Sequence, residues 1–381
     1  MEAAPPLETI PALPERPNPA GMEFIPAPLS WPAIAPGVGL VKPGEAETNA
    51  LTESFRTAYI EECLRNPSLD GVLGGDFVHR WPAAAPLCRV QNWRDPSLAE
   101  TPNTWGIPSL VLAIQSMEGN WVFTVRGAIL NIYGKSAGRK GANGAAGYGV
   151  PVGDEFLYKG GIAQRFEYGL LYVDPDGKGG FTPGTAPSTV EAVPEILGYL
   201  SAEGTSTETD FREAWKRSMN SGLPPLKADG PALRLDFSGT SWEIPVDTAA
   251  AGTIPITALY YQSFNQGSVL FLLAQTTAAS AQTFGTGFHT RIIAGPFLDT
   301  FLAGRDHPLP GADAPPLFIT QPGVPGLRPE DAPFHEAVLQ GLARYGLPLT
   351  DAAPSREGNP ERDGDTFRET QRFSQGWMVV Q

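Results

Sequence analysis

The sequence predicts a mainly β protein with short helices, an α+β fold built from tandem-duplicated repeat units. Three observations favour this fold class. The 381 residues include 43 glycines and 39 prolines but only 18% charged residues, a composition typical of many turns and short strands. Apolar and polar residues alternate from Phe166 to Tyr172, as in a half-buried strand. Similar segments, each interpreted as helix, turn and β-hairpin, recur in the same order in both halves, with further β-hairpins between them.

Residues 1–50 are expected to form a proline-rich extended arm, because proline at this density excludes regular helix and pairing within a sheet. The arm either lies on the body of the protein or reaches a neighbouring copy. It carries apolar side chains, among them Phe24, Ile25 and Leu29, which a free tail would leave in water. The arm is therefore a candidate contact in a homo-oligomer.

A helix is expected from Thr52 to Cys63, with Thr52 as the N-cap. Residues 55–59 have a near copy at 211–215 and a looser one at 334–338. A glycine-containing turn and a strand with aromatic residues follow each copy. Each of these units is therefore predicted to form a helix, a turn and a hairpin with aromatic residues.

Two further segments are interpreted as matching β-hairpins, one at 105–128 and the other at 253–275. In this alignment Gln115 corresponds to Gln262. The order of all parts predicts a first half at 51–190, a linker at 191–204 and a second half at 205–381, with the differences in length falling in loops.

A turn and a strand recur with particular fidelity. Residues 148–151 read Tyr-Gly-Val-Pro and 164–166 read Gln-Arg-Phe, while residues 345–348 read Tyr-Gly-Leu-Pro and 371–373 again read Gln-Arg-Phe. The two phenylalanines are interpreted as core anchors. The positions to which we assign a structural role in the repeat are Tyr148, Gly149, Pro151, Gln164, Phe166, Tyr345, Gly346, Pro348, Gln371 and Phe373.

This pattern resembles the LGFP-repeat family of exported bacterial cell-wall proteins. Residues 148–169 are the best match and 345–381 the second, while 55–95 and 211–244 are weaker; together they cover under half of the chain. The resemblance implies an envelope location and an association with wall polymer, and it implies no reaction.

The first residues contain neither a basic start nor an apolar core of a signal peptide. The chain is therefore either cytoplasmic or a mature form lacking its signal peptide, and the resemblance favours an extracellular or envelope location. The net charge of −14 argues against nucleic acid or an anionic membrane surface as partner. No apolar run is long enough to span a membrane.

Cys63 and Cys88 are the two cysteines of the chain. They form either one disulfide, which would close a loop between a helix and a strand, or two buried free thiols. Their spacing does not match a metal or redox motif.

No catalytic constellation or cofactor motif is recognisable. The acidic pairs Asp154-Glu155 and Glu61-Glu62 could supply a general acid and base, but we interpret them as solvated. The four histidines are too far apart in sequence to predict a metal site. We therefore assign no catalytic residue, metal or cofactor.

Aromatic residues on the short strands are the candidate ligand-binding side chains. Trp93, Tyr168 and Trp377 lie at strand positions expected to be exposed, where their rings could stack on sugars. We therefore expect a noncatalytic secreted or surface protein that binds envelope glycan or scaffolds the wall. A self-assembling extracellular subunit with an exchanged N-terminal arm is the first alternative, and a hydrolase acting on wall polymer is the second.

Overall fold

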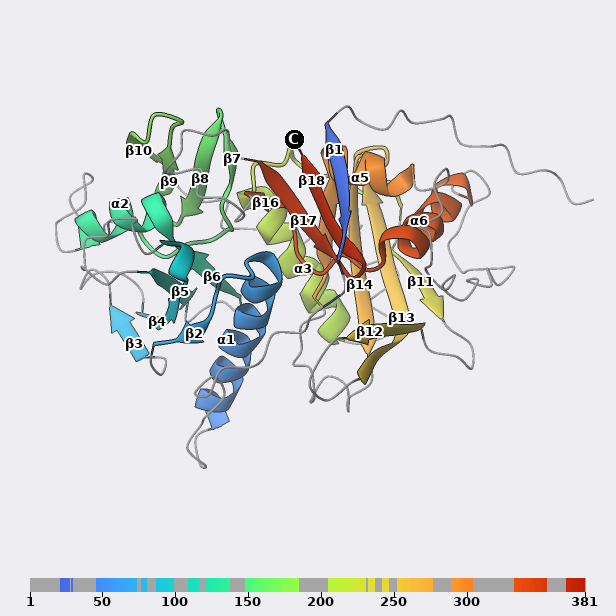
Figure 1. The fold of residues 1–381 in the computed structure, drawn as a ribbon, viewed down its shortest axis with the longest axis horizontal. Helices are drawn as coiled ribbons and strands as arrows, with labels where there is room; N and C mark the ends of the chain where they lie inside the picture. The colour runs from blue at the N-terminus through green and yellow to red at the C-terminus, as the bar shows by residue number, and fades with distance from the viewer. Residues whose placement is uncertain are drawn as a thin grey trace, which may run out of the picture.

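The computed structural model describes residues 21–27, 29, 46–73, 77–80, 87–98, 109–116, 121–137, 148–184, 205–230, 232–236, 242–246, 252–276, 289–303, 332–354 and 368–380. The fold is mainly β with helices, as the composition predicts. Two bodies lie side by side, with α1 (Ala46–Arg65) and α3 (Thr205–Asn220) between them (Figure 1). The first half of the fold begins with α1, and the second half begins with α3.

The first half is built on an antiparallel sheet in the order β2-β4-β5-β6, in which β3 also pairs with β4. Besides α1, its elements are β2 (Gly71–Val72), β3 (Phe77–Arg80), β4 (Leu87–Arg94), the 3-10 helix η1 (Pro96–Leu98), β5 (Leu110–Ser116), β6 (Val122–Val125) and α2 (Gly127–Ala137). The alternation of β5 sends Val111 and Ala113 to the face that α1 covers, and Leu112 and Ile114 to the face that α2 covers.

The second half repeats this arrangement. Its sheet has the order β11-β13-β14-β15, and β12 also pairs with β13. The elements are α3, β11 (Leu233–Asp236), β12 (Trp242–Val246), β13 (Gly252–Phe264), β14 (Val269–Thr276), β15 (Arg291–Ala294), α5 (Gly295–Leu302) and α6 (Ala332–Tyr345). Strands β13, β14 and β15 therefore take the positions of β4, β5 and β6. That the two halves arose by duplication stays a prediction, which this shared strand order supports.

The predicted match between the hairpins 105–128 and 253–275 is wrong by one strand. Gln91 of β4 lies opposite Ala113 of β5, and Gln262 of β13 lies opposite Phe271 of β14. Gln262 therefore corresponds to Gln91 and not to Gln115. Short apolar strands resemble one another, so similarity between two of them does not determine which strands correspond.

Each half also contains a small antiparallel sheet. In the first half its order is β10-β9-β8-β7, and in the second half β1-β18-β17-β16. The strands are β7 (Phe156–Tyr158), β8 (Gly161–Phe166), β9 (Gly169–Val173), β10 (Gly179–Pro183), β16 (Ala353–Pro354), β17 (Glu369–Phe373), β18 (Gly376–Val380) and β1 (Met22–Pro26). The N-terminal strand β1 thus occupies in the second half the position that β10 occupies in the first.

The expectation that residues 1–50 cannot pair within a sheet is wrong for β1. Its proline, Pro26, is the last residue of an edge strand, where a missing N–H costs least. The helix also begins earlier than predicted, at Ala46 rather than Thr52. Most of the remaining predicted arm, and the predicted linker 191–204, lie outside the described residues.

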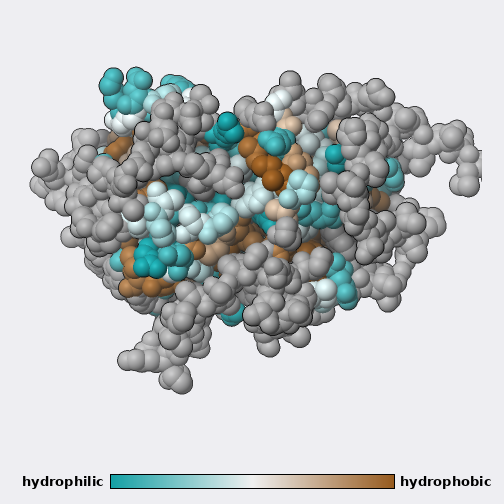
Figure 2. Space-filling model, viewed as in Figure 1, coloured by the Kyte–Doolittle hydropathy of each residue, from teal (hydrophilic) through white to brown (hydrophobic). Residues whose placement is uncertain are grey.

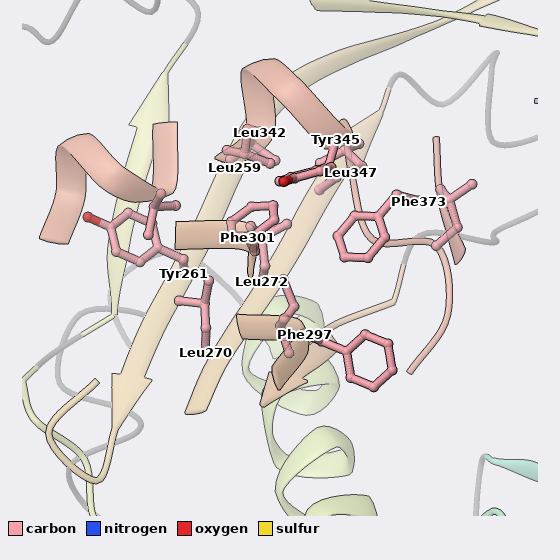
Figure 3. Packing of buried hydrophobic residues seen from close by; sticks show 14 of the residues in the cluster. Leu259, Tyr261, Leu270, Leu272, Phe297, Phe301, Leu342, Tyr345, Leu347 and Phe373 are labelled. Carbon is pink, nitrogen blue, oxygen red and sulfur yellow. The ribbon is translucent and has the colours of Figure 1, made fainter. Parts of the chain in front are cut away.

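The largest core cluster lies in the second half. Leu259, Tyr261, Leu270 and Leu272 of the central sheet face the side chains of α5, α6 and the small sheet (Figure 3). Phe301 stands at the centre of this packing and is fully buried. No described helix is long and apolar enough to cross a membrane.

The predicted disulfide is wrong, because Cys63 and Cys88 are not bonded to each other; Cys88 is a buried thiol and Cys63 a partly buried one. Cys63 packs with the cluster on the α1 face of the first central sheet, whereas Cys88 packs with the cluster on the opposite face. The sheet itself separates the two sulfur atoms. Burial raises the pKa of the Cys88 thiol to about 11 and that of Cys63 to about 12, so both stay protonated at neutral pH.

Candidate functional site

The repeated tyrosine-glycine-x-proline turn has the same conformation in both halves. Gly149 and Gly346 have φ angles of 79° and 77°, in the region that favours glycine. The side chain of Glu167 accepts a hydrogen bond from the Val150 N–H (3.1 Å), and Ser374 Oγ accepts one from Leu347 (3.0 Å). Pro151 bridges to Phe166, and Pro348 bridges to Phe373.

The repeated glutamine holds this turn against the central sheet. Gln164 donates from Nε2 to the carbonyls of Gly153 (3.0 Å) and Thr124 (2.8 Å). Gln371 donates in the same way to Thr350 and Ile292, both at 2.9 Å. Both glutamines are fully buried. A buried amide that donates to two buried carbonyls stabilises the fold, in agreement with the structural role that the repeat predicts for this glutamine.

The repeated phenylalanines are core anchors, as expected. Phe166 and Phe373 are both fully buried. Phe166 stacks on Tyr133 with ring centroids 5.0 Å apart, and Phe373 stacks on Phe301 at 5.9 Å. The tyrosine of each turn contacts the edge strand beside it. Tyr148 lies 4.6 Å from Phe181 of β10, and Tyr345 lies 5.0 Å from Phe24 of β1.

The turns place two aspartates at the junction between the halves. Asp154 accepts a hydrogen bond from Arg65 of α1 at 3.3 Å. Asp351 accepts one from Nε of Arg217 of α3 at 3.0 Å and another from the Ile292 N–H at 2.8 Å. Both aspartates therefore reach helices that lie between the halves, and each is paired with a guanidinium.

A buried network of ion pairs lies in the first half, beside this junction. Arg126 contacts Asp95 at 2.7 Å and Glu62 at 3.4 Å, and Arg65 lies 3.6 Å from Glu62. Burial opposes the charge on Asp95, but Arg126 and hydrogen bonds from three neighbouring side chains outweigh it and lower the pKa of this carboxyl. Across the junction, Glu61 pairs with Arg291. Paired charges of this kind are costly to break singly.

The acidic pairs are therefore not solvated as predicted. The side chain of Asp154 is 14% exposed, while Glu155, Glu61 and Glu62 are all buried residues. Their partners come from distant parts of the chain, so no local pattern indicated their burial.

A cavity of about 250 Å³ lies where the two halves meet. Its walls come from the first-half turn before β7, the end of α3, the β15–α5 junction and the second-half turn that leads to β17. Many of its lining residues are apolar, including Phe156, Leu223, Ile292, Pro296 and Phe297. Figure 2 shows hydrophobic side chains (brown) beside hydrophilic ones (teal) in the middle of the molecule.

Charged groups join this apolar lining. Carboxylates come from both halves, and one guanidinium lies among them: Asp154, Glu155, Asp351, Glu369 and Arg217. Burial raises the pKa of Glu369 above its ordinary value. Apolar walls with a few convergent polar groups at a domain junction are typical of small-molecule sites.

The equivalent position in the first half carries a much larger side chain than the cavity wall does. Gly127 and Gly295 each begin a helix after the last central strand, with φ angles of 51° and 55°. The residue before the glycine is Arg126 in the first half and Ala294 in the second. Arg126 is buried in the network of ion pairs, whereas the short side chain of Ala294 lines the cavity.

None of the three predicted aromatic ligand residues lines this cavity. Trp93 was expected to be exposed but is fully buried against Tyr59, with its N–H donated to Gln91 at 2.7 Å. Tyr168 and Trp377 are partly exposed, and the Trp377 ring lies under the Arg372 guanidinium at 4.9 Å. Sequence alternation could not place Trp93, because both faces of the first central sheet are covered by helices.

The described residues include no group of three or more histidine, cysteine or acidic side chains placed to hold a metal ion. Comparison with known protein families finds no matching family model, and comparison with curated proteins finds no match. The resemblance to LGFP repeats therefore stays a prediction from the motifs.

Proposed function

We propose that this protein is a noncatalytic binding protein of the cell envelope that holds one unit of a wall glycan in the cavity between its halves. The observation that carries the proposal is the lining of that cavity. Phe156, Phe297 and Pro296 are apolar residues of this lining, of the kind that suits the C–H face of a sugar ring. Carboxylates at the same cavity can accept hydrogen bonds from hydroxyl groups.

The size of the cavity favours one small unit rather than a long chain. At about 250 Å³ it is below the roughly 300–1,000 Å³ of sites for drug-sized ligands. The envelope location rests on the resemblance to LGFP repeats. In the alternative of an exchanged arm, the pairing of β1 with β18 would form between two copies rather than within one chain.

A pull-down on purified wall glycan tests the proposal. Ala294→Leu places a larger side chain at the cavity wall and should reduce the retained fraction, with its melting temperature measured alongside. Trp377→Ala removes a partly exposed aromatic residue outside the cavity and should leave retention unchanged. Equal retention of wild type and Ala294→Leu would contradict the proposal, and a loss confined to Trp377→Ala would move the site to the outer surface.

A hydrolase is the second candidate, because carboxyl groups converge in the same cavity. Glycoside hydrolysis uses a protonated carboxyl and an ionised one. Glu369, with its raised pKa, would be the protonated group, and Asp351 lines the same cavity as a second carboxyl group. Release of reducing ends from wall glycan by the wild type, and not by Glu369→Gln, would favour this activity over binding alone.

A further inference from the structure

The second half carries a carboxyl group where the first half carries a buried aliphatic side chain. Glu369 lies opposite Val380 across β17 and β18, and Ile162 lies opposite Val173 across β8 and β9. The two positions are equivalent by register. Ile162 is 2% exposed, so the fold at this position accepts an apolar residue. A carboxyl group here is therefore not required for packing.

The carboxyl of Glu369 is also without a compensating cation among the described residues. Burial is the one influence on its pKa, which it raises. Burying a carboxylate without a partner is unfavourable, because the group loses its hydration. The guanidinium that lines the same cavity, Arg217, is already bonded to Asp351 and to the Thr290 carbonyl.

At another position of the cavity lining the difference between the halves is reversed, because the charged residue lies in the first half. The first half has a guanidinium at Arg126, whereas the second half has the methyl group of Ala294. At these two pairs of equivalent positions, the second half therefore has a methyl group where the first has a cation, and a carboxyl group where the first has an aliphatic side chain. Both of these second-half residues face one cavity, since Ala294 and Glu369 line it together.

We infer that the ligand of this cavity carries a protonated amine, which pairs with Glu369 while the apolar walls hold the rest of the unit. This inference rests on the proposed function and specifies its ligand: an amino sugar with a free amine fits better than a neutral sugar. The other charged groups at the cavity are Asp154, Glu155, Asp351 and Arg217. With Asp154 and Asp351 each paired to an arginine, their charges add little to the attraction.

Calorimetric titration of the full chain with three sugars of the same ring tests the inference. The probes are glucosamine, glucose and N-acetylglucosamine, of which glucosamine carries the cation. The wild type should bind glucosamine at least about tenfold more tightly than glucose, as expected for a charge-assisted contact. Glu369→Gln should abolish this preference, and Glu243→Gln, which changes an exposed residue of β12, should retain it.

A measurement on the wild type alone tests the inference even if the Glu369→Gln variant fails to fold. Raising the pH until the amine of glucosamine is deprotonated should remove its advantage over glucose. Equal affinities for glucosamine and glucose, or a preference that survives in folded Glu369→Gln, would overturn the inference and leave the proposed function standing. If none of the three sugars binds the wild type, the proposed function is overturned as well.

Discussion

Pro26 of β1 lies opposite Gly376 of β18, and Pro183 of β10 lies opposite Gly169 of β9 at the same register. The N-terminal strand therefore completes the second small sheet in the way that the strand after β9 completes the first. A segment from one end of the chain and a segment from the other form one sheet. This relationship makes β1 part of the folded body rather than a separate arm.

Deletion of residues 1–27 should lower the melting temperature, because it removes β1 and exposes the edge of β18 together with the Tyr345 ring that Phe24 covers. A synthetic peptide of residues 21–29, added in excess, should restore part of the loss. Thermal unfolding followed by circular dichroism measures both. An unchanged melting temperature in the deleted protein would show that β1 does not contribute to stability.

Replacement of Gln371 by leucine should destabilise the second half by about 2–4 kcal/mol, because two buried carbonyls lose their donor. Gln164→Leu should have a similar effect on the first half. Gln375→Leu is the control, since its side-chain amide donates a long and partly buried hydrogen bond to the Ala343 carbonyl (3.5 Å). Denaturant unfolding provides the free energies, and losses below about 1 kcal/mol in both halves would argue against this role.

Replacement of Arg126 by methionine should cost about 3–5 kcal/mol, because it leaves Glu62 and Asp95 buried without this guanidinium. Arg94→Met breaks an exposed pair with Asp70 and should cost far less, because solvent screens the interaction. Comparison of the two variants by denaturant unfolding distinguishes the contribution of a buried ion pair to stability from that of an exposed one. Equal losses would contradict the importance of burial.

Glu369 should make the free protein less stable as the pH rises. Its pKa is raised in the folded state above the ordinary value of 4.5, so the folded protein binds its proton more tightly than the unfolded chain does. The contribution of the protonated carboxyl to the stability of the folded protein is complete below pH 4.5. It is lost as the pH rises through the folded-state pKa. The stability of Glu369→Gln relative to wild type should therefore increase over this interval. A difference that is independent of pH would contradict the assignment.

The parts of the fold that the sequence predicted are those determined locally. The turn at Tyr148 and its copy at Tyr345 depend on a glycine with positive φ, and the strand that follows depends on a buried glutamine and phenylalanine. These residues lie close together in the chain, so their pattern is visible without the structure. The mainly β character follows from the same turns.

The parts that the sequence did not predict depend on contacts between distant segments. Pairing of β1 with β18 joins residues at opposite ends of the chain. The cavity combines the turn after Tyr148 with β15 and β17 of the other half, and Glu369 was not among the predicted site residues. The match of the two Gln-Arg-Phe segments already sets Glu369 against Ile162, but nothing in the sequence placed this position at a cavity.

The most direct test of the central claim, that the cavity between the halves is the binding site, is a titration followed through alanine methyl groups. Ala294 and Ala352 both line the cavity. In alanine-methyl-labelled protein titrated with glucosamine, the NMR signals of these two residues should shift together and saturate at one dissociation constant. Ala113, a buried residue of β5 in the cluster on the α1 face of the first central sheet, lies outside the cavity lining and should not shift. Saturable binding without shifts at Ala294 and Ala352, or no binding at all, would contradict the account.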